Sequence, residues 1–541
     1  MKKNNHFFNF FLLIILIFIF SIPVSAVSIV PPINLSEYES ENAKYRPQTE
    51  SNESEYDIYK NGNYPEKFDL REIGRVSGAK EQKFPWDEWA FASTGAIESS
   101  MTAKGIYLDI SEDYLIENSG LDRICKMNIE KRAAAFLESQ AGVVLESDRI
   151  QDEPFLKMKI NAYFVDKDDI KEMLYNFGAV QSSINFRIGW NEFFNNETFS
   201  QYSTDEYSNN DQILITGWDD KYPKENFVFM PPGDGAWICK TSEGMNWGDG
   251  GYFYLSYYDA SIGNNNLVYN NSIDDGERKN IYQYQISEDI GAMGYAGYED
   301  NWFANTFNKN PGIEQLDSVG FYTFEDNVEY EVWAIKDFKN DGLNSREYVG
   351  SGMLQHKGYH TVELDKKLIL DAQEFGVVVK VSTNIDRSIG VSLPDPTIDD
   401  RRNKGYLSYN GEAWLDLGIY EEYKADVCLK AFTINESSPL EPDFLKNAEE
   451  WETCDTYDIN KSWIIKFSEN LHGELNADKV AIYDALTYEP IITTHVINED
   501  NIIVTPANSY DKKEYILYIG DITSSSGQRL KNAVKMKFIV N

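Results

Sequence analysis

The segment AKEQKFPWDEWAFASTGAIESSM, residues 79–101, decides the fold of the first half of this chain. Residues 89–101 combine apolar side chains with small ones, a pattern that predicts a buried helix. Glu88 lies in the first turn of that helix, where a carboxylate meets free N–H groups and the positive end of the helix dipole. A second helix with an acidic start is expected over residues 168–177.

Outward from these helices, several short apolar runs predict strands in the same domain. They cover residues 178–185, 212–218, 235–240 and 251–258. Helices mixed with aromatic-rich strands favour an α+β domain, which we place at residues 64–275. The preceding residues 27–63 are polar, acidic and poor in apolar periodicity, so they are expected to form a linker.

Residues 1–26 have the layout of a secretory signal peptide. Lys2 and Lys3 precede an apolar run over residues 7–20, and residues 24–26 offer small side chains for cleavage. A retained membrane anchor is the alternative, although the run is short for a spanning helix. The sequence therefore predicts an extracellular or cell-surface protein with no membrane span after signal cleavage.

Composition excludes several classes of protein. The chain of 541 residues carries 88 acidic and 50 basic side chains, and its net charge of −38 is too negative for a protein that neutralises nucleic-acid phosphates. Its hydrophobic content of 42% is that of a globular protein rather than a disordered one. Four cysteines are too few for a disulfide-dense scaffold, and Cys428 and Cys454, the closest in sequence, are the pair expected to form any disulfide.

After residue 280 the pattern changes to short strands separated by turn residues. In residues 281–434 these strands predict a β-sandwich, with runs at 317–323, 330–335, 360–364, 376–381, 405–409 and 426–432. Residues 440–541 again alternate apolar and polar side chains, as is typical of an Ig-like sandwich, with runs at 463–467, 479–483, 501–504 and 515–519.

Many motifs of the first domain occur in the order found in papain-type cysteine peptidases, a family that this segment resembles. The similar motifs are PEKFDLR at 65–71, AKEQ at 79–82, WAFAS at 89–93, ISEDYL at 110–115, GAV at 178–180, GWDD at 217–220, GAWICK at 235–240 and GDGGYF at 248–253. The resemblance implies a papain-like fold, and it also implies where the catalytic residues should stand.

At those positions the chain departs from the family. Glu88 stands where the family has its nucleophilic cysteine, and Asp211 stands where it has its histidine. Thr241 replaces the asparagine that orients the histidine. Gln82, which matches the glutamine of the family's oxyanion hole, is retained.

The scarcity of histidine leads to the same conclusion. The chain has His6, His356, His360, His472 and His495, so none lies within residues 64–275. A papain-type site needs a thiolate whose pKa is lowered by an imidazolium and a helix N-terminus. Because no Cys–His or Ser–His pair can form inside this domain, Cys125 and Cys239 are expected to be structural.

Two roles are open for Glu88 and Asp211. Two close carboxylates cannot both ionise cheaply, so the pair could share a proton or recruit a cation. The simpler interpretation is that Glu88 stabilises the start of its helix and Asp211 is solvated. We therefore expect no cofactor and no metal, with Glu88 and Asp211 as the sole candidate metal ligands.

The two later domains resemble modules of secreted surface proteins. Residues 281–434 are similar to the lectin-like domain that follows papain-type peptidases in some secreted bacterial and archaeal proteins, through residues 302–307, 319–323, 358–362 and 427–432. That name rests on the fold, so it implies carbohydrate binding only faintly, through aromatic side chains that could stack on sugars. Residues 440–541 resemble the bacterial Ig-like repeats of cell-wall and S-layer proteins.

These observations predict a secreted cell-surface pseudopeptidase. Its papain-like domain would lack catalytic activity and serve as a binding or structural module. The expected partner is a protein or peptide in the degenerate cleft, or a cell-surface glycan, and not a nucleic acid. An active cysteine peptidase and a glycan-binding adhesin acting through residues 281–434 are the alternatives.

Overall fold

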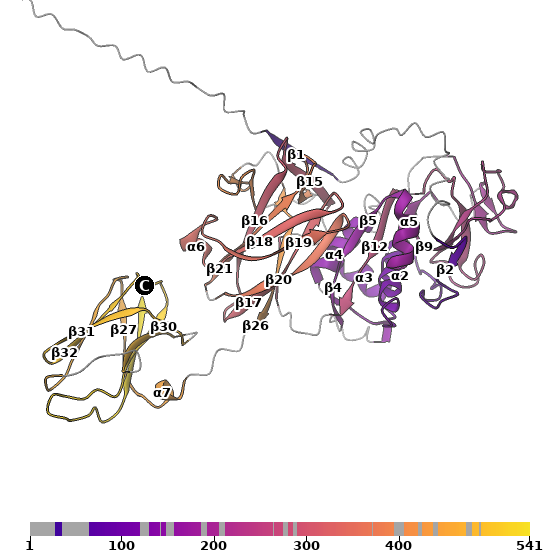
Figure 1. The fold of residues 1–541 in the computed structure, drawn as a ribbon. Helices are drawn as coiled ribbons and strands as arrows, with labels where there is room; N and C mark the ends of the chain where they lie inside the picture. Colours follow the sequence, from indigo (N-terminus) through magenta and orange to yellow (C-terminus); the bar gives the residue numbers. More distant parts are fainter. Residues whose placement is uncertain are drawn as a thin grey trace, which may run out of the picture.

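The structure is a computed structural model that shows three domains in sequence order (Figure 1). It describes residues 28–34, 64–119, 129–140, 142–147, 156–185, 192–204, 211–262, 264–273, 280–284, 289–370, 372–393, 405–419, 425–435, 442–471, 479–485 and 488–540. The expected signal peptide, His6, Cys125, His472 and most of the expected linker lie outside the described residues. Within the described part of the chain, no helix is long and apolar enough to cross a membrane.

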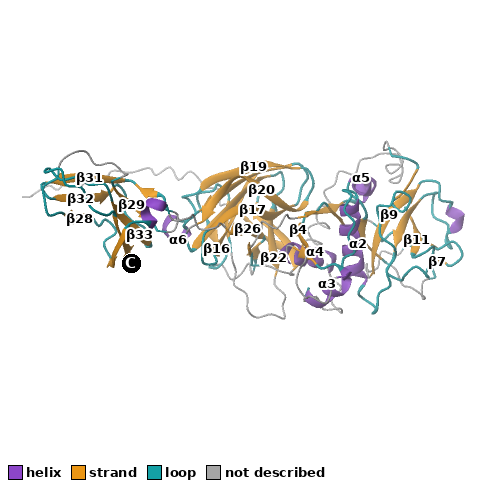
Figure 2. Ribbon diagram, turned by 90° about the horizontal axis from the view of Figure 1, so that it is seen from below, coloured by secondary structure: helices purple, strands orange, loops and turns teal. Residues whose placement is uncertain are grey.

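The first domain contains most of the helical residues (Figure 2). Its helices are α2 (Glu88–Thr102), α3 (Glu112–Asn118), α4 (Ile129–Gln140), α5 (Ile170–Asn176) and the 3-10 turns Lys167–Asp169 and Lys224–Asn226. Its strands are β2 (Lys67–Asp69), β3 (Gly142–Val143), β4 (Leu156–Lys159), β5 (Ala162–Val165), β6 (Val180–Ile184), β7 (Phe194–Asn195), β8 (Ser200–Gln201), β9 (Asp211–Asp219), β10 (Ala236–Lys240), β11 (Tyr252–Ser256), β12 (Asn264–Tyr269) and β13 (Ser272–Ile273). The predicted helices and strands of this domain are confirmed. Helix α4 and the strands β3, β4, β5, β7, β8, β12 and β13 have no counterpart among them.

Helix α2 lies at the centre of this domain and is buried over almost its whole length. Trp89, Ala96, Ile97 and Met101 are at most 1% exposed and belong to the main core. The small side chains between them let strand β9 pack closely, because a Cβ atom added at Gly95 would lie 3.1 Å from the Leu214 side chain. The apolar and small composition of residues 89–101 therefore reflects burial on several sides.

The middle domain is a two-layered β structure, as predicted. Its elements are β14 (Asn280–Tyr282), β15 (Asp289–Tyr295), β16 (Asp300–Asn308), β17 (Glu314–Thr323), β18 (Val328–Ile335), α6 (Phe338–Asp341), β19 (Glu347–Leu354), β20 (Gly358–Leu370), β21 (Glu374–Ser382), β22 (Ile389–Leu393), β23 (Tyr406–Ser408), β24 (Leu415–Asp416), β25 (Asp426–Val427) and β26 (Leu429–Asn435). A six-stranded sheet in the order β19-β18-β21-β16-β23-β24 forms one layer. Its inward side chains share one core with those of β17, β20 and β26.

The expected linker contains a strand that belongs to the middle domain. β1 (Ile29–Asn34) pairs antiparallel with β15, at the edge of a four-stranded sheet with β22 and β25. The prediction of a linker over 27–63 is therefore wrong for this segment. Its sequence IVPPIN contains two prolines, which an edge strand tolerates because one side of its backbone needs no hydrogen-bond partner.

One sheet runs without interruption through the first and middle domains. Strand β5 pairs with β12 on one side and with β20 on the other, so the order continues β26-β17-β20-β5-β12-β6-β9-β10-β11. Gly358 makes the contact with β5 achievable: its φ is +138°, and a Cβ atom there would lie 2.2 Å from the Ala162 carbonyl oxygen. The two domains therefore also share one hydrophobic core, to which Tyr322, Tyr359 and Cys428 of the middle domain belong.

A buried ion pair crosses the same interface. Glu138 of α4 and Lys430 of β26 lie 3.7 Å apart, and both side chains are 0% exposed. The Tyr322 hydroxyl donates a 2.6 Å hydrogen bond to Glu138, and the ammonium of Lys430 lies 4.9 Å from the ring centroid of Tyr359. Burial raises the pKa of Glu138 to about 7, although the nearby Lys430 acts in the opposite direction.

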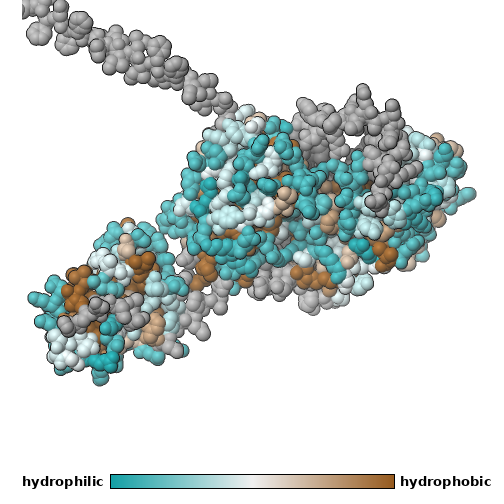
Figure 3. Space-filling model, in the orientation of Figure 1, coloured by the Kyte–Doolittle hydropathy of each residue, from teal (hydrophilic) through white to brown (hydrophobic). Residues whose placement is uncertain are grey.

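The C-terminal domain consists of two sheets around a separate core. Its elements are α7 (Asp443–Lys446), β27 (Glu449–Thr456), β28 (Trp463–Lys466), β29 (Val480–Asp484), β30 (Pro490–Ile491), β31 (Thr493–Asn498), β32 (Asn501–Pro506), β33 (Glu514–Ile519) and β34 (Val534–Val540). Apolar patches are visible on its surface in Figure 3, where hydrophilic side chains cover most of the middle domain. The Ig-like assignment of this domain stays a prediction.

The expected disulfide between Cys428 and Cys454 is wrong. Both residues are in the thiol form. Cys428 is 1% exposed in the core that joins the first two domains, whereas Cys454 lies on β27 of the C-terminal domain. Closeness in sequence did not bring them together, because the domain boundary falls between them.

We expect Lys430→Met to destabilise the unit formed by the first two domains by about 3–5 kcal/mol, because Glu138 would stay buried without its cation. Lys336→Met is the matched control, since Lys336 pairs with Glu347 at the surface and contributes about 0–1 kcal/mol. Urea unfolding of the full chain measures both values. Equal losses for the two variants would contradict the importance of the buried pair.

The pKa of Glu138 also predicts a pH dependence. Since folding raises this pKa from its ordinary value near 4.5 to about 7, the stability that Glu138 contributes is complete below about pH 4.5 and is lost as the pH rises through about 7. In Glu138→Gln, the amide cannot ionise but can still accept the Tyr322 hydrogen bond. The free energy of unfolding of the wild type, relative to this variant, should therefore fall between pH 4.5 and 7, and a flat difference would count against the raised pKa.

Candidate functional site

Two of the four site residues predicted from the sequence, Glu88 and Thr241, line one pocket where α2 meets β9 and β10. The other two are neighbours of this pocket: Asp211 directly precedes the lining residue Gln212, and Gln82 bonds to the lining residue Ser242. Glu88 is the first residue of α2 and is 8% exposed, and Asp211 is the first residue of β9. Thr241 directly follows β10 and is 7% exposed. Gln82 reaches the same region through a β-bridge between its neighbour Glu81 and Glu243.

Hydrogen bonds fix three of these residues. Ser242 donates from its hydroxyl to the side-chain oxygen of Gln82 at 2.7 Å, while the Gln82 N–H donates to the Ser242 carbonyl at 2.8 Å. The Thr241 hydroxyl donates to the Gly251 carbonyl at 3.2 Å. Asp211 accepts a 2.9 Å hydrogen bond from the N–H of Gln212. The side chains at the family's glutamine and asparagine positions are therefore held by their immediate neighbours.

A small pocket lies against Glu88 and Thr241. Its wall also includes Gln212 and Leu214 of β9 and Lys240 of β10. The cavity volume is about 10 Å³, which is room for roughly one water molecule. This pocket is therefore too small for a peptide side chain.

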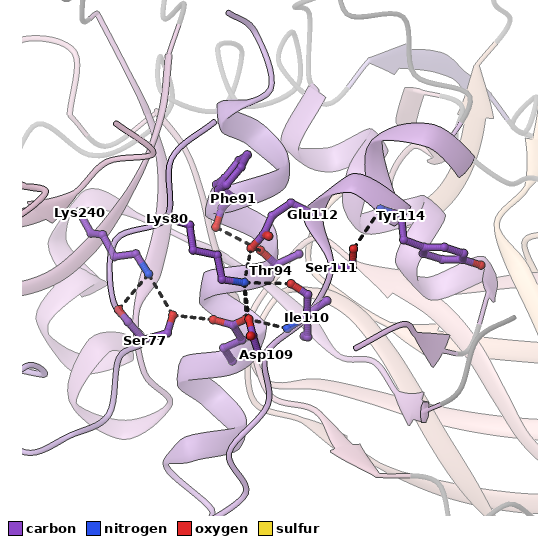
Figure 4. A network of polar contacts seen from close by, with 11 residues as sticks. Ser77, Lys80, Phe91, Thr94, Asp109, Ile110, Ser111, Glu112, Tyr114 and Lys240 are labelled. Carbon is purple, nitrogen blue, oxygen red and sulfur yellow. Dashed lines mark hydrogen bonds and ion pairs between the residues drawn. The ribbon is translucent and has the colours of Figure 1, made fainter. Parts of the chain in front are cut away.

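A network of charged side chains forms the inner wall of the pocket (Figure 4). Lys80 lies 3.3 Å from Glu98, 2.8 Å from Glu112 and 2.7 Å from Asp109. Burial disfavours the charged form of Lys80, but Glu98 and Glu112 outweigh it and raise its pKa. The network thus holds Lys80 as a cation between the start of α3 and the middle of α2.

Lys240 extends this network toward β10. Its ammonium donates to the carbonyl and hydroxyl oxygens of Ser77 at 3.1 and 3.0 Å, and the Ser77 hydroxyl donates to Glu98 at 2.5 Å. Burial lowers the pKa of Lys240 to about 8. The chain Lys240–Ser77–Glu98–Lys80 therefore ties the strand that precedes Thr241 to the helix that begins at Glu88.

The described cysteines and histidines lie away from this pocket. Cys239 is fully buried in β10, and burial raises its pKa well above the ordinary value, so its thiol stays protonated. His360 packs against Tyr163 at the interface of the first two domains, with 5.2 Å between ring centroids, as does His356. Burial lowers the pKa of His360 to about 4. None of these three residues is among those that line the pocket.

The cation hypothesis for Glu88 and Asp211 stays a prediction. Among the described residues, no group of three or more His, Cys, Asp or Glu side chains is arranged to hold a metal ion. The charge network around Lys80 was not part of the predicted site. The sequence signal that could have revealed it is the group of acids Asp109, Glu112 and Asp113, together with Glu98 among the small residues of α2.

Comparison with known proteins finds a matching family for each of the first two domains. The profile of the papain family cysteine proteases matches residues 64–271, and that of a lectin like domain matches residues 281–433. Cysteine proteinase 15A of Pisum sativum is 29% identical over 216 residues, which cover 36% of this chain and 58% of that protein. Cathepsin L of Sarcophaga peregrina is 26% identical over 212 residues, which cover 36% of this chain and 59% of that protein. Each alignment thus spans less than two thirds of the relative.

Two solved structures share the arrangement of the first two domains. The clostridial cysteine protease Cwp84 after propeptide cleavage has a TM-score of 0.59 at 23% identity, covering 68% of this chain and 99% of that one. The cysteine protease and lectin-like domains of Cwp84, a surface layer associated protein of Clostridium difficile, give 0.59 at 22% identity, covering 69% and 90%. These similarities show the fold: an α+β papain-like domain followed by a lectin-like β domain.

We expect Lys80→Met to destabilise the first domain by about 3–5 kcal/mol, because Glu98 and Glu112 would be left buried without their cation. Lys83→Met is the control, since Lys83 pairs with Asp113 and is 60% exposed, and its loss should change stability by at most about 1 kcal/mol. Thermal and urea unfolding of both full-length variants measure the difference. A Lys80→Met variant as stable as the control would show that the network is dispensable.

Proposed function

We propose that this chain, in which residues 64–271 belong to the papain family of cysteine peptidases and residues 281–433 form a lectin-like domain, is a secreted surface protein whose peptidase centre is inactive. One observation carries the proposal. Glu88 and Thr241 line one pocket, and Asp211 directly precedes Gln212, which also lines it. The three residues stand at the positions where the resemblance implies the nucleophile, its base and the orienting amide.

Chemistry supports the loss of activity. Acyl transfer by the family mechanism needs a thiolate next to an imidazole. At the start of α2 the side chain is a carboxylate, and the described thiol nearest in sequence to Thr241, that of Cys239, is buried in the core and protonated. His356 and His360 are held in the domain interface by Tyr163. No proton shuttle therefore reaches Glu88 from the described histidines.

The scaffold around the centre is intact, which supports a structural or binding role. The charged network of Lys80 and Lys240 connects α2, α3 and β10, and the pocket beside Glu88 has room for about one water molecule. Phe84 and Trp86, in the loop before Glu88, are 53% and 46% exposed. A protein or peptide partner would therefore contact exposed side chains near this pocket, such as Phe84 and Trp86, rather than enter it.

Location at the cell surface belongs to the same proposal. Its support is the signal-like segment at residues 1–26 and the shared fold with Cwp84, which is described as surface layer associated. An active cysteine peptidase is the second candidate, and it is favoured by the sequence similarity to cysteine proteinase 15A and cathepsin L.

Restoring the family residues tests the proposal. The wild type should hydrolyse no peptide substrate, and an epoxide reagent that traps catalytic thiols should label neither Cys125 nor Cys239. In the variant that combines Glu88→Cys, Asp211→His and Thr241→Asn, the new thiol should react with the epoxide near pH 6 at least about ten times faster than in Glu88→Cys alone. The imidazole would lower its pKa from the ordinary value of roughly 8.5.

Mass spectrometry of the labelled full-length proteins locates the modified residue. Hydrolysis by the wild type that the epoxide abolishes would identify an active peptidase and end the proposal. Equal labelling rates in the single and triple variants would mean that the three positions do not form one centre.

A further inference from the structure

The outer face of the six-stranded sheet in the middle domain carries an aromatic row. Trp302 of β16 and Trp333 of β18 are stacked, with ring centroids 4.7 Å apart, and Tyr348 of β19 meets Trp333 edge-on at 6.0 Å. Their sequence neighbours Phe303 and Val332 point the other way and fill the core, as the alternation of a strand requires. Trp302 and Trp333 are half-buried, because they pack in a cluster with Phe338, Leu343, Tyr406 and Trp414 on this face. Tyr348 is 47% exposed and is the open end of the row.

Arg346 lies on this row in a fixed position. Its guanidinium carbon is 4.9 Å from the ring centroid of Trp302 and 5.5 Å from that of Trp333. Nη1 donates to the carbonyl oxygens of Leu343 and Gly411 at 3.1 and 2.8 Å. The ring of Trp414 lies 6.0 Å from the same carbon, so three rings and two carbonyls hold the group and leave its Nε and Nη2 donors for another acceptor.

Among the described residues, Arg346 forms no ion pair within 4.0 Å, although the chain carries 88 acidic residues and a net charge of −38. Glu412 attracts its guanidinium only from a longer distance. Lys380 on the same face is directly paired, with Glu331 at 2.9 Å and Asp300 at 3.4 Å. The guanidinium fork of Arg346 can therefore bind a carboxylate from outside the protein.

Glycine at position 411 allows the loop to build this arrangement. Its φ is +73°, and a Cβ atom there would lie 2.9 Å from the indole of Trp302 and 3.0 Å from Nη2 of Arg346. Any other residue would push the loop away from the indole and disturb the carbonyl that holds Arg346. Close packing of this loop therefore pre-orients the guanidinium before a ligand arrives.

We propose that this face binds an acidic saccharide, with its carboxylate on the free edge of Arg346 and an apolar face of its ring against Tyr348, the open end of the aromatic row. Aromatic side chains offer large rigid contact surfaces, and a guanidinium fork matches a carboxylate with two parallel hydrogen bonds. Polar groups for the hydroxyls of the saccharide lie next to Trp302, on the paired side chains of Lys380, Glu331 and Asp300. This site is in the second domain and does not depend on whether the peptidase centre is inactive.

Calorimetric titration of the full chain at low salt tests the site with three oligosaccharides. These are tetragalacturonic acid, its methyl ester and the neutral galactose tetramer. The acid should bind at least ten times more tightly than the ester or the neutral sugar. Arg346→Gln should reduce acid binding at least tenfold, to the level of the ester, and Arg346→Lys should recover part of it because the charge remains but the fork is lost.

Two further variants keep the result decisive. Arg529→Gln removes an exposed arginine of the C-terminal domain that pairs with Asp521, and it should bind the acid as the wild type does. Tyr348→Ala, which leaves Arg346 in place, should weaken the acid and the neutral sugar alike, and it replaces Arg346→Gln if that variant does not fold. The proposal is overturned if the wild type fails to bind the acid at millimolar concentration, if acid and ester bind equally, or if the Arg346 and Arg529 variants lose affinity to the same extent.

Discussion

The backbone pairing of β5 with β20 is the constraint on which the rest of this structure depends. Without β20, strand β5 would be the edge of the first domain's sheet and would expose a row of unpaired N–H and C=O groups. Pairing satisfies these groups and joins the sheet that carries Asp211 and Thr241 to the sheet of the middle domain. The papain-like and lectin-like domains consequently share one core and behave as one structural unit.

Lysines that interact with buried acids connect the elements of this unit in an unusually acidic chain. Lys430 meets Glu138 across the domain interface, while Lys80 and Lys240 connect the helices and strands around the old catalytic centre. Each pair carries the cost of removing two charges from water, so its formation need not add much stability. Breaking a pair is expensive, however, because one charge would remain buried alone. The networks therefore fix the relative positions of the elements more than they increase the total stability.

The lysine network around Lys80 and Lys240 is separate from the three positions Glu88, Asp211 and Thr241. None of the hydrogen bonds that hold Lys80 and Lys240 involves these three residues. Glu88 begins α2, where the helix dipole favours a carboxylate, and Thr241 caps the turn after β10 through the Gly251 carbonyl.

Local patterns predicted the fold of most segments. Helix α2 and several strands in each of the three domains followed from apolar periodicity, since that signal depends on neighbours a few residues away. The errors arose where the partner is distant. The strand at Ile29–Asn34 was assigned to a linker because its pairing partner β15 lies about 260 residues later in the chain. Cys428 was paired with Cys454 because sequence distance does not show a domain boundary.

The sequence by itself determined which residues stand where the resemblance implies catalytic ones, because the order of motifs along the chain locates Glu88, Asp211 and Thr241 without any knowledge of distance. Tertiary structure alone decided that the pocket lined by Glu88 and Thr241 has room for about one water molecule. It also decided that His356 and His360 pack against Tyr163, and that Arg346 lies on a tryptophan pair without an ion pair among the described residues. Contacts such as the one between Asn161 and Thr361 join residues 200 positions apart. No local pattern encodes such contacts, because they form only when separate elements pack together.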